Sequence, residues 1–308
     1  MNKQTAKDWL LTASLFLIVS TLPTYFLVWG DLNALVSLLP IMLAAGLIFS
    51  GITVYVVTPW SLGKTTRRLD RQTSSTILPL LHDVAQKSRM KKTPALFFIN
   101  DKSLNAMAYS SLTGPRVALT SGLVTFYNEG KLSTDELSAI LAHELGHISE
   151  MHVFREAFVL SWASILESVG SILCRIGSSK VGVLLGAWAV LSVLAGTVMT
   201  ILTKLVSVIT FMFSRHLELR ADSFASHSLG APAPMVSALR KIHSANEELA
   251  AKELEELKRL PGYEAWQYKP VKASMIDRLF ETHPSIERRI RNLESTADST
   301  GNEIIRTG

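Results

Sequence analysis

The run from Ala142 to His147 reads Ala-His-Glu-Leu-Gly-His, and its residue types are those of a hydrolytic metal site. Residues four apart lie on one face of an α-helix, so His143 and His147 can bind the same metal ion. Glu144 follows the first histidine, where its carboxylate can take a proton from a metal-bound water. The alternative is a surface helix with two solvated histidines, because so short a motif also arises by chance.

The residues around this motif predict a buried helix. Ser133 and Glu136 have the S-x-x-E spacing of a capping box, which marks a helix start. Histidines set into an apolar helix face need partners for their ring nitrogens, and zinc supplies one. Gly146 leaves room for another backbone or a substrate to approach. The apolar residues that recur at helical spacing are Leu137, Ile140, Leu141, Leu145 and Ile148.

A catalytic zinc site needs a third protein ligand and leaves its fourth position to water. The segment Ser214–Asp222 offers that ligand, because Glu218 and Asp222 are four residues apart and face the same way on a helix. Glu218 would bind the metal, while Asp222 would hold the second ring nitrogen of a ligand histidine. His216 is a competing ligand on another face of this helix. Without the histidine motif, a charged helix start after a membrane span would explain the segment better.

Together these motifs resemble those of the HtpX-type membrane zinc metalloproteases, relatives of the CaaX prenyl proteases. The matching pieces are His143-Glu144-x-x-His147, Glu218-x-x-x-Asp222, a hydrophobic hairpin between them, and three shorter stretches. Those stretches are Asn105-Ala106-Met107-Ala108, Thr282-His283-Pro284 and Arg289. The resemblance covers the chain from its N-terminal hydrophobic runs to about residue 290.

The resemblance implies roles for residues that spacing alone does not assign. His283 would stabilise the oxyanion of the tetrahedral intermediate, and Arg289 would brace the catalytic groups. Asn105 would clamp a substrate main chain, with Ala106 and Met107 continuing an edge strand to which the substrate adds. The simpler alternatives are that Asn105 only makes a turn and that His283 only precedes a helix that starts at Pro284.

The composition is that of a membrane protein, since 48% of the residues are hydrophobic and only 19% are charged. One charge-free run lies between Asp8 and Asp31 and a second between Asp31 and Lys64, which predicts a pair of membrane spans. The first run is too long for a cleaved secretory signal, and the second follows it at once. Basic residues flank this pair on one side, so the positive-inside rule predicts that residues 64–152 are cytoplasmic.

A second hydrophobic hairpin lies between the two metal-binding motifs. Residues 181–203 predict a full span that residues 205–213 extend, whereas its partner, residues 158–174, is short and contains Glu167. Both motifs must reach one zinc ion, so the chain must return to the side from which it left. A hairpin that crosses the bilayer twice would do this, and so would one that only dips into the interface. Glu167 itself is either functional or a carboxylate that faces water or protein.

The remaining sequence predicts a small catalytic domain built from two stretches. We expect a helix over 77–90, a strand over 94–99, and a hairpin that turns at 113–115 and returns over 116–120. Residues 246–259 favour a charged helix with a solvated face. The predicted fold is therefore a mainly α integral membrane protein with a small β element. It has two N-terminal transmembrane helices, a second hydrophobic hairpin and a zincin-like α+β catalytic domain. The predicted divisions are residues 1–63, 64–152, 153–213, 214–295 and a tail over 296–308.

These expectations describe a zinc metalloendopeptidase with one Zn²⁺ per chain, in the bacterial inner membrane, that cleaves misfolded or surplus membrane proteins and also itself. The alternatives are a prenyl-protein-type processing protease, for which the spans are too few, and a zinc-stabilised scaffold without activity, which would not need Glu144. A transporter would need more paired charges within its spans. The net charge of +5 lies largely beside the predicted spans, so we expect contact with anionic lipid and none with nucleic acid.

Overall fold

The structure is a computed structural model that describes residues 32–63, 66–68, 71–149, 151–179, 186–259 and 284–295. The predicted first span, His283 and the predicted tail lie outside these residues. The chain divides into two compact units, which are described separately. The first comprises residues 1–56 and 151–214, and the second comprises residues 57–150 and 215–308. The sequence predicts the corresponding divisions after residues 63, 152 and 213.

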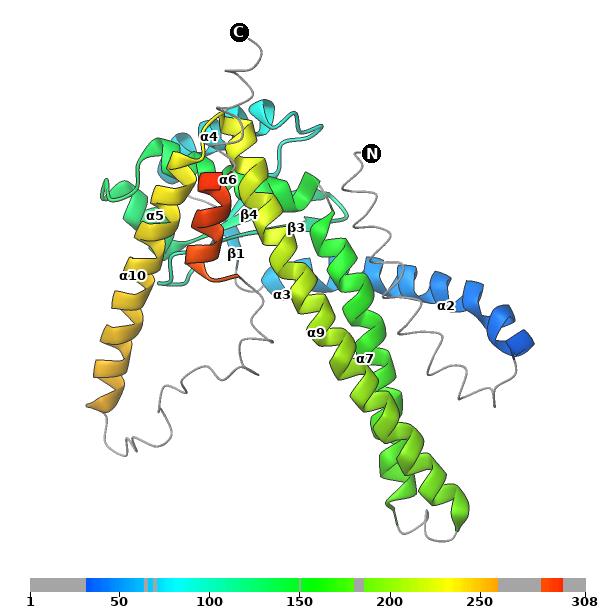
Figure 1. Ribbon diagram of the computed structural model, residues 1–308. Coiled ribbons are helices and arrows are strands. Elements are labelled where there is room, and N and C mark those ends of the chain that lie inside the picture. The colour runs from blue at the N-terminus through cyan, green and yellow to red at the C-terminus, as the bar shows by residue number, and fades with distance from the viewer. Residues whose placement is uncertain are drawn as a thin grey trace. The chain divides into compact units, whose positions relative to one another are not determined.

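The first unit is helical. It contains α2 (Leu32–Ile52), α7 (His152–Gly177) and the first part of α9 (Ala187–Leu229). Figure 1 shows α7 and α9 running antiparallel, side by side. Within the described residues, α9 is the helix that is both long and apolar enough to cross a membrane. A shorter apolar stretch, Gly46–Trp60, covers the end of α2, the π-helix η1 (Thr53–Val57) and the first residues of α3. The number of membrane spans therefore stays a prediction.

Small residues let α7 and α9 approach closely. A Cβ atom on Gly170 would lie 2.9 Å from the carbonyl oxygen of Gly196, and a Cβ on Gly196 would collide with the carbonyl of Gly170. Close backbone approach through glycine is the usual way in which helices pack in lipid. Glu167 is paired across this interface with Lys204, at 2.7 Å, so the carboxylate that looked isolated in the sequence has a cationic partner.

The second unit contains a four-stranded sheet in the order β1-β2-β4-β3. Its strands are β1 (Thr66–Arg68), β2 (Ala95–Ile99), β3 (Ala106–Ser111) and β4 (Gly114–Thr120). The β3–β4 hairpin turns at residues 112–113, where Ser111 faces Gly114, so the predicted turn at 113–115 was placed too late. The reason is local: Gly114 takes a φ of 126°, and Ser111 Oγ donates to its carbonyl oxygen. Pro115 then begins the return strand.

Alternate residues of β4 face two different cores. Val117 and Leu119 pack with Leu81 of α4 (Arg71–Lys87) and with Leu141 of α6 (Thr134–Ser149) in the main core. Ala118 points to the other face, in a small cluster with Ile99 and Tyr109 against which Leu62 of α3 (Thr58–Gly63) packs. The sheet thus places β3 at one edge, beside the helix that carries the histidine motif.

Several elements start or end away from their predicted positions. The helix predicted over 77–90 is α4, which starts six residues earlier, and the charged helix predicted over 246–259 is the end of α10 (Ala233–Lys258). Two elements are not predicted at all, β1 and α5 (Ser121–Asn128). A further helix covers residues 286–295 and begins two residues after Pro284, where one of the alternatives placed a helix start. The second hydrophobic run and the Glu218 segment form one helix, α9, so no loop separates the predicted span from the predicted ligand.

The capping box predicted at the start of α6 is present. The backbone N–H of Ser133 donates to Glu136 Oε2 at 2.7 Å, and the N–H of Glu136 donates to Ser133 Oγ at 3.2 Å. The same carboxylate also accepts hydrogen bonds from Ser237 Oγ and Lys241 Nζ of α10. Burial alone would raise the pKa of Glu136, but these donors outweigh it and lower the pKa to about 2. One carboxylate therefore both starts the metal-binding helix and ties it to α10.

The Glu136→Gln variant is expected to lose about 1–3 kcal/mol of unfolding free energy at neutral pH, the range for hydrogen bonds to a buried charge. Because the folded pKa is depressed, this contribution is present above the ordinary pKa of 4.5 and is lost as pH falls towards 2. Denaturant titrations between pH 7 and pH 3 should show the gap between wild type and variant closing. Asp135→Asn, an exposed acid in the same first turn, is the control and should change little. A gap that does not change with pH would contradict the role of the charge.

Candidate metal centre

Two helices bring the predicted ligands together. α6 carries His143 and His147, whose Nε2 atoms lie 3.2 Å apart. α9 carries Glu218, which has one carboxylate oxygen 3.6 Å from His143 Nε2 and the other 3.4 Å from His147 Nε2. His143 and Glu218 are buried, and His147 is partly exposed. Among the described residues, protein atoms therefore cover two of the three ligands, and His147 is the more accessible one.

This donor set suits zinc. Donor atoms about 2.0–2.2 Å from a tetrahedral zinc lie roughly 3.3–3.6 Å from one another. The three separations of 3.2, 3.4 and 3.6 Å in the structure fall in or near that range. Two imidazoles and one carboxylate are also the ligands of many catalytic zinc sites, which keep a position for water. The two distances from Glu218 are to different oxygens of its carboxylate, and His143, His147 and Glu218 form a group that could hold one metal ion.

Gly146 explains how α9 can come so close to α6. A Cβ atom at this position would lie 3.2 Å from the Cα of Ala221 and 3.3 Å from the Cβ of Phe224. Both distances are tighter than ordinary van der Waals contact. Ala221 lies between Glu218 and Asp222 in the sequence, so the missing side chain of Gly146 lets both acids reach the histidines. The close approach predicted for this glycine is that of the ligand helix.

Asp222 and Arg289 support the first histidine from behind. Asp222 is fully buried, and its Oδ1 lies 2.9 Å from His143 Nδ1. Arg289, on the helix over 286–295, binds the same carboxylate through Nη2 at 2.6 Å and Nε at 2.8 Å. Arg289 Nη2 also lies 3.4 Å from His143 Nδ1, but both are donors when Nδ1 carries a proton, so the shorter contact with Asp222 decides the tautomer. With Nδ1–H donating to Asp222, the lone pair of Nε2 faces the metal position.

Oppositely charged groups of the site shift one another's pKa values. Burial lowers the pKa of His143, but hydrogen bonds to Asp222 and Glu218 outweigh it and raise the pKa to about 9. Burial likewise opposes the charge of Asp222, yet Arg289 and His143 keep the pKa of this carboxyl below its ordinary value. The pKa of Arg289 is raised in turn by Asp222, Glu218 and Glu144, again against burial. A metal ion needs the neutral imidazole of His143, so metal binding competes with protonation of this ring.

The predicted general base, Glu144, is buried on α6 next to the first ligand. Its negative charge acts on Arg289, which places it within electrostatic reach of the same cluster. His216, the competing ligand, is exposed on α9, and the metal-binding group consists of His143, His147 and Glu218 without it. Among the described residues, the geometry therefore favours Glu218 as the third ligand.

The predicted substrate-binding stretch lies at the start of β3. Asn105 is exposed and its Oδ1 accepts a hydrogen bond from the N–H of Ala106 at 2.9 Å. The backbone N–H of Asn105 donates to Thr120 Oγ1, and its carbonyl oxygen accepts from the N–H of Thr120. Met107 packs against the small cluster on the second face of the sheet. Asn105 thus organises the chain that enters the edge strand.

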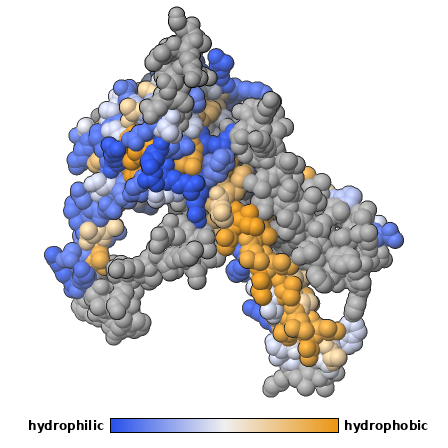
Figure 2. All heavy atoms as spheres, in the orientation of Figure 1, coloured by the Kyte–Doolittle hydropathy of each residue, from blue (hydrophilic) through white to orange (hydrophobic). Residues whose placement is uncertain are grey.

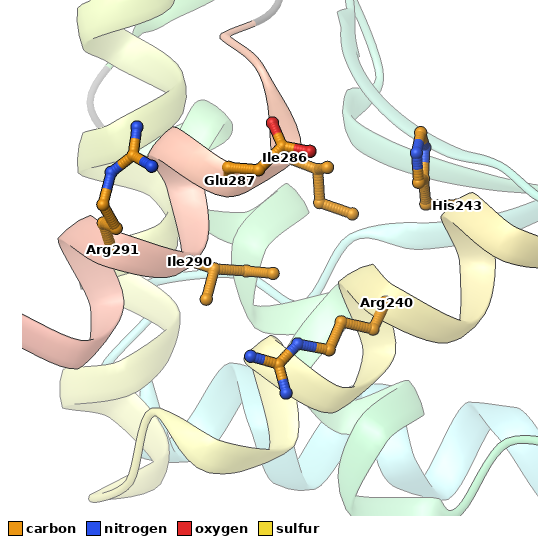
Figure 3. Close-up of a pocket in the computed structure, with 6 residues that line it drawn as sticks. All are labelled: Arg240, His243, Ile286, Glu287, Ile290 and Arg291. Atoms are coloured by element: carbon orange, nitrogen blue, oxygen red, sulfur yellow. The ribbon is translucent and has the colours of Figure 1, made fainter.

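A separate groove of about 380 Å³ lies between α10 and the helix over 286–295 (Figure 3). Its apolar floor comes from Ile286 and Ile290, and charged groups of both signs surround it. Arg240 is paired there with Glu294 at 3.5 Å. The groove does not contain the metal-binding group.

A family comparison agrees with this geometry. Residues 71–297, which include every described ligand and Arg289, match the family described as Peptidase family M48. The chain belongs to peptidase family M48. The prediction of a metalloendopeptidase is therefore confirmed.

Similar proteins carry the name Protease HtpX homolog, which confirms the HtpX-type resemblance seen in the sequence. The chain is 33% identical over 189 residues to Protease HtpX homolog 2 of Methanosarcina mazei, a match that spans 58% of each chain. It is 31% identical to Protease HtpX homolog of Bacteroides fragilis, over 74% of this chain and 70% of the relative. A longer match, to Protease HtpX homolog of Janthinobacterium sp., is 29% identical over 83% of this chain and 87% of the relative.

The sequence does not mark the residues that α10 contributes to the support of the site. Ser237 and Lys241 bind Glu136 at the start of the metal-binding helix, and Asn246 binds the backbone of Leu104 before β3. These contacts join residues more than 100 positions apart. Asn246 opens a charged segment whose local pattern indicates only a solvated helix, so no sequence signal marks it.

Proposed function

We propose that this M48 chain is a membrane-bound zinc endopeptidase whose active site lies between α6 and α9. The observation that carries the proposal is the donor set of His143, His147 and Glu218, with three separations that suit one zinc ion and with Glu144 next to the first ligand. A purely structural zinc site is closed by four protein ligands and needs no adjacent base. Three ligands and a buried glutamate fit hydrolysis better.

The residues divide the work of peptide hydrolysis among them. Zinc held by the three ligands would polarise a peptide carbonyl and lower the pKa of water towards neutrality. Glu144 takes the proton of the attacking water and passes it to the leaving amine. Asp222 holds the Nδ1–H of His143, and Arg289 holds Asp222 by two hydrogen bonds. His283 is proposed to stabilise the oxyanion, a role that rests on the family resemblance of the Thr282-His283-Pro284 stretch.

The substrate is proposed to bind as an extended strand along β3. This strand is the terminal one of the four-stranded sheet, and it packs beside α6. A polypeptide that adds to such an edge gains main-chain hydrogen bonds that do not depend on its sequence. Asn105, Ala106 and Met107 lie where this edge begins. The arrangement suits a protease with broad polypeptide substrates.

The long helix α9 supports membrane insertion. Its exposed large apolar side chains recur at helical spacing from Trp188 to Met212, and at 1.5 Å per residue this band is about 36 Å long. The hydrocarbon core of a bilayer is about 30 Å thick. Figure 2 shows the hydrophobic band along this part of the molecule. The ion pair between Glu167 and Lys204 lowers the cost of placing these two charges in the bilayer. This favours a hairpin that crosses the bilayer twice over a hairpin that only dips into the interface.

The active site is proposed to face the cytoplasm and to act on membrane proteins. Basic residues follow the predicted N-terminal spans, so the positive-inside rule places the catalytic residues in the cytoplasm of a bacterium, at the inner membrane. A site attached to membrane helices and open to extended chains suits misfolded or surplus membrane proteins, the chain itself included.

The proposal is tested with the full chain purified in detergent and then reconstituted in vesicles. Cleavage of an unfolded membrane protein should stop when 1,10-phenanthroline removes the metal and should return when Zn²⁺ is added in stoichiometric amount. The matched control is addition of Mg²⁺, whose preference for oxygen ligands predicts no recovery. Zinc binding without cleavage of any polypeptide would contradict the proposal and favour a zinc-stabilised scaffold without activity.

A further inference from the structure

The pairing of β3 with β4 determines which backbone groups of β3 face its outer edge. Ser111 closes the hairpin opposite Gly114, and the N–H of Thr120 donates to the carbonyl oxygen of Asn105 at 3.0 Å. Backbone groups of successive residues in a strand point to opposite sides. Since those of Asn105 point towards β4, those of Leu104, Ala106 and Ala108 point away from it, to the edge that would receive a substrate.

The first of these outward-facing positions is occupied by a side chain of α10. Asn246 Oδ1 accepts the N–H of Leu104 at 2.8 Å, and Asn246 Nδ2 donates to the carbonyl oxygen of Leu104 at 3.1 Å. The side-chain amide therefore makes the same two hydrogen bonds that a neighbouring strand would make. The side chain of Leu104 is buried in the main core, so this residue is fixed both by packing and by its hydrogen bonds to Asn246.

The next outward-facing group is also engaged from within the chain. The N–H of Ala106 donates to Asn105 Oδ1 at 2.9 Å. Moving along β3, the following outward groups are the carbonyl of Ala106 and then the N–H and carbonyl of Ala108. Two asparagine side chains thus cover the entry of the strand up to the middle of Ala106.

We propose that Asn246 is a positioning residue that sets the register of the substrate strand by closing the edge of β3 at Leu104, so that pairing starts at Ala106. The proposal rests on strand addition to β3, as in the proposed function. Residues in a strand are about 3.3 Å apart, and a register that keeps side-chain facing moves by two residues. One such step would move the scissile bond about 6.6 Å along the strand, away from its place at the metal. A fixed stop therefore selects one bond for cleavage.

The test uses the full chain in detergent and a peptide that the wild type cuts at one main bond. In Asn246→Ala the start of β3 loses the hydrogen bonds that hold it, so the substrate must order this segment and the KM should rise about threefold to tenfold, the cost of about one net hydrogen bond. The backbone groups of Leu104 also become available for pairing with a shifted substrate. New products should appear from cleavage two residues away, while zinc content and kcat stay near wild type. Asn246→Asp keeps an acceptor for the N–H of Leu104 but loses the donor. Its KM and its share of shifted products should lie between those of the wild type and of Asn246→Ala. Glu247→Ala, an exposed neighbour on α10, is the control.

Hydrogen exchange at the Leu104 amide reports the clamp without reference to activity, and it should become faster in Asn246→Ala. Faster exchange combined with an unchanged KM and a single cleavage site would overturn the positioning role. Loss of zinc or of the folded state in both Asn246 variants would also overturn it, in favour of a structural role. If the wild type fails to cleave any peptide, the proposed function fails, which is a result distinct from these.

Discussion

The Glu144→Gln variant is expected to bind one zinc ion per chain with wild-type affinity and to lose about 10²- to 10⁴-fold in kcat. Glutamine has nearly the same shape as glutamate, so the neighbouring ligands His143 and His147 keep their positions. It cannot take a proton from water, so the step that creates the nucleophile loses its base. The measurement combines zinc content with kcat on an unfolded polypeptide.

The control for this variant is Glu129→Gln, which removes an exposed acid whose nearest cation is Lys131 at the surface. It should leave both zinc content and kcat unchanged. In membranes, substrates should accumulate or co-purify with Glu144→Gln but not with the control. A Glu144→Gln protein that still cleaves at the wild-type rate would transfer the role of base to another group.

The parts that the sequence predicts well are those decided within a few residues. The capping box of Ser133 and Glu136 forms as expected, because both bonds involve neighbouring positions. The i, i+4 spacing of His143 and His147 likewise brings both rings together on one face of the helix. The acids Glu218 and Asp222 also reach these rings together, since helical spacing turns both of them to one face.

The parts that the sequence predicts poorly depend on contacts made across the chain. The first turns of α10 pack on α6, since Met235 shares a hydrophobic cluster with Ala139 and Leu293. The charged pattern of residues 246–259 hides this packing. The strand β1 is three residues long and is held by pairing with β2, so its own residues carry little signal.

The support of the metal site shows the same limit. Nothing local to Arg289 marks it as the partner of Asp222, 67 residues earlier, and only the family resemblance points to it. The continuity of α9 is also invisible to patterns of hydropathy, because the sequence changes from apolar to charged near residue 214 while the helix runs on. Helical geometry continues through such a change since it depends on the backbone and not on the polarity of the side chains.

The second large effect is expected from removal of the third ligand. The Glu218→Ala variant should lose zinc at concentrations that saturate the wild type, and cleavage should disappear with the metal. Loss of a group that only supports a ligand typically costs about 10- to 100-fold in metal affinity, so loss of a ligand itself should cost more. His143 and His147 would remain as a two-ligand site, with Asp222 and Arg289 still paired behind it.

His216→Ala is the matched control, because it removes the competing ligand from the same helix two residues away. It should keep both zinc and activity, since His216 is exposed and lies outside the metal-binding group of the described residues. Zinc titration of the two purified variants in parallel separates the assignments. Retained zinc in Glu218→Ala together with lost zinc in His216→Ala would move the third ligand to His216, and α9 would then have to turn a different face towards α6.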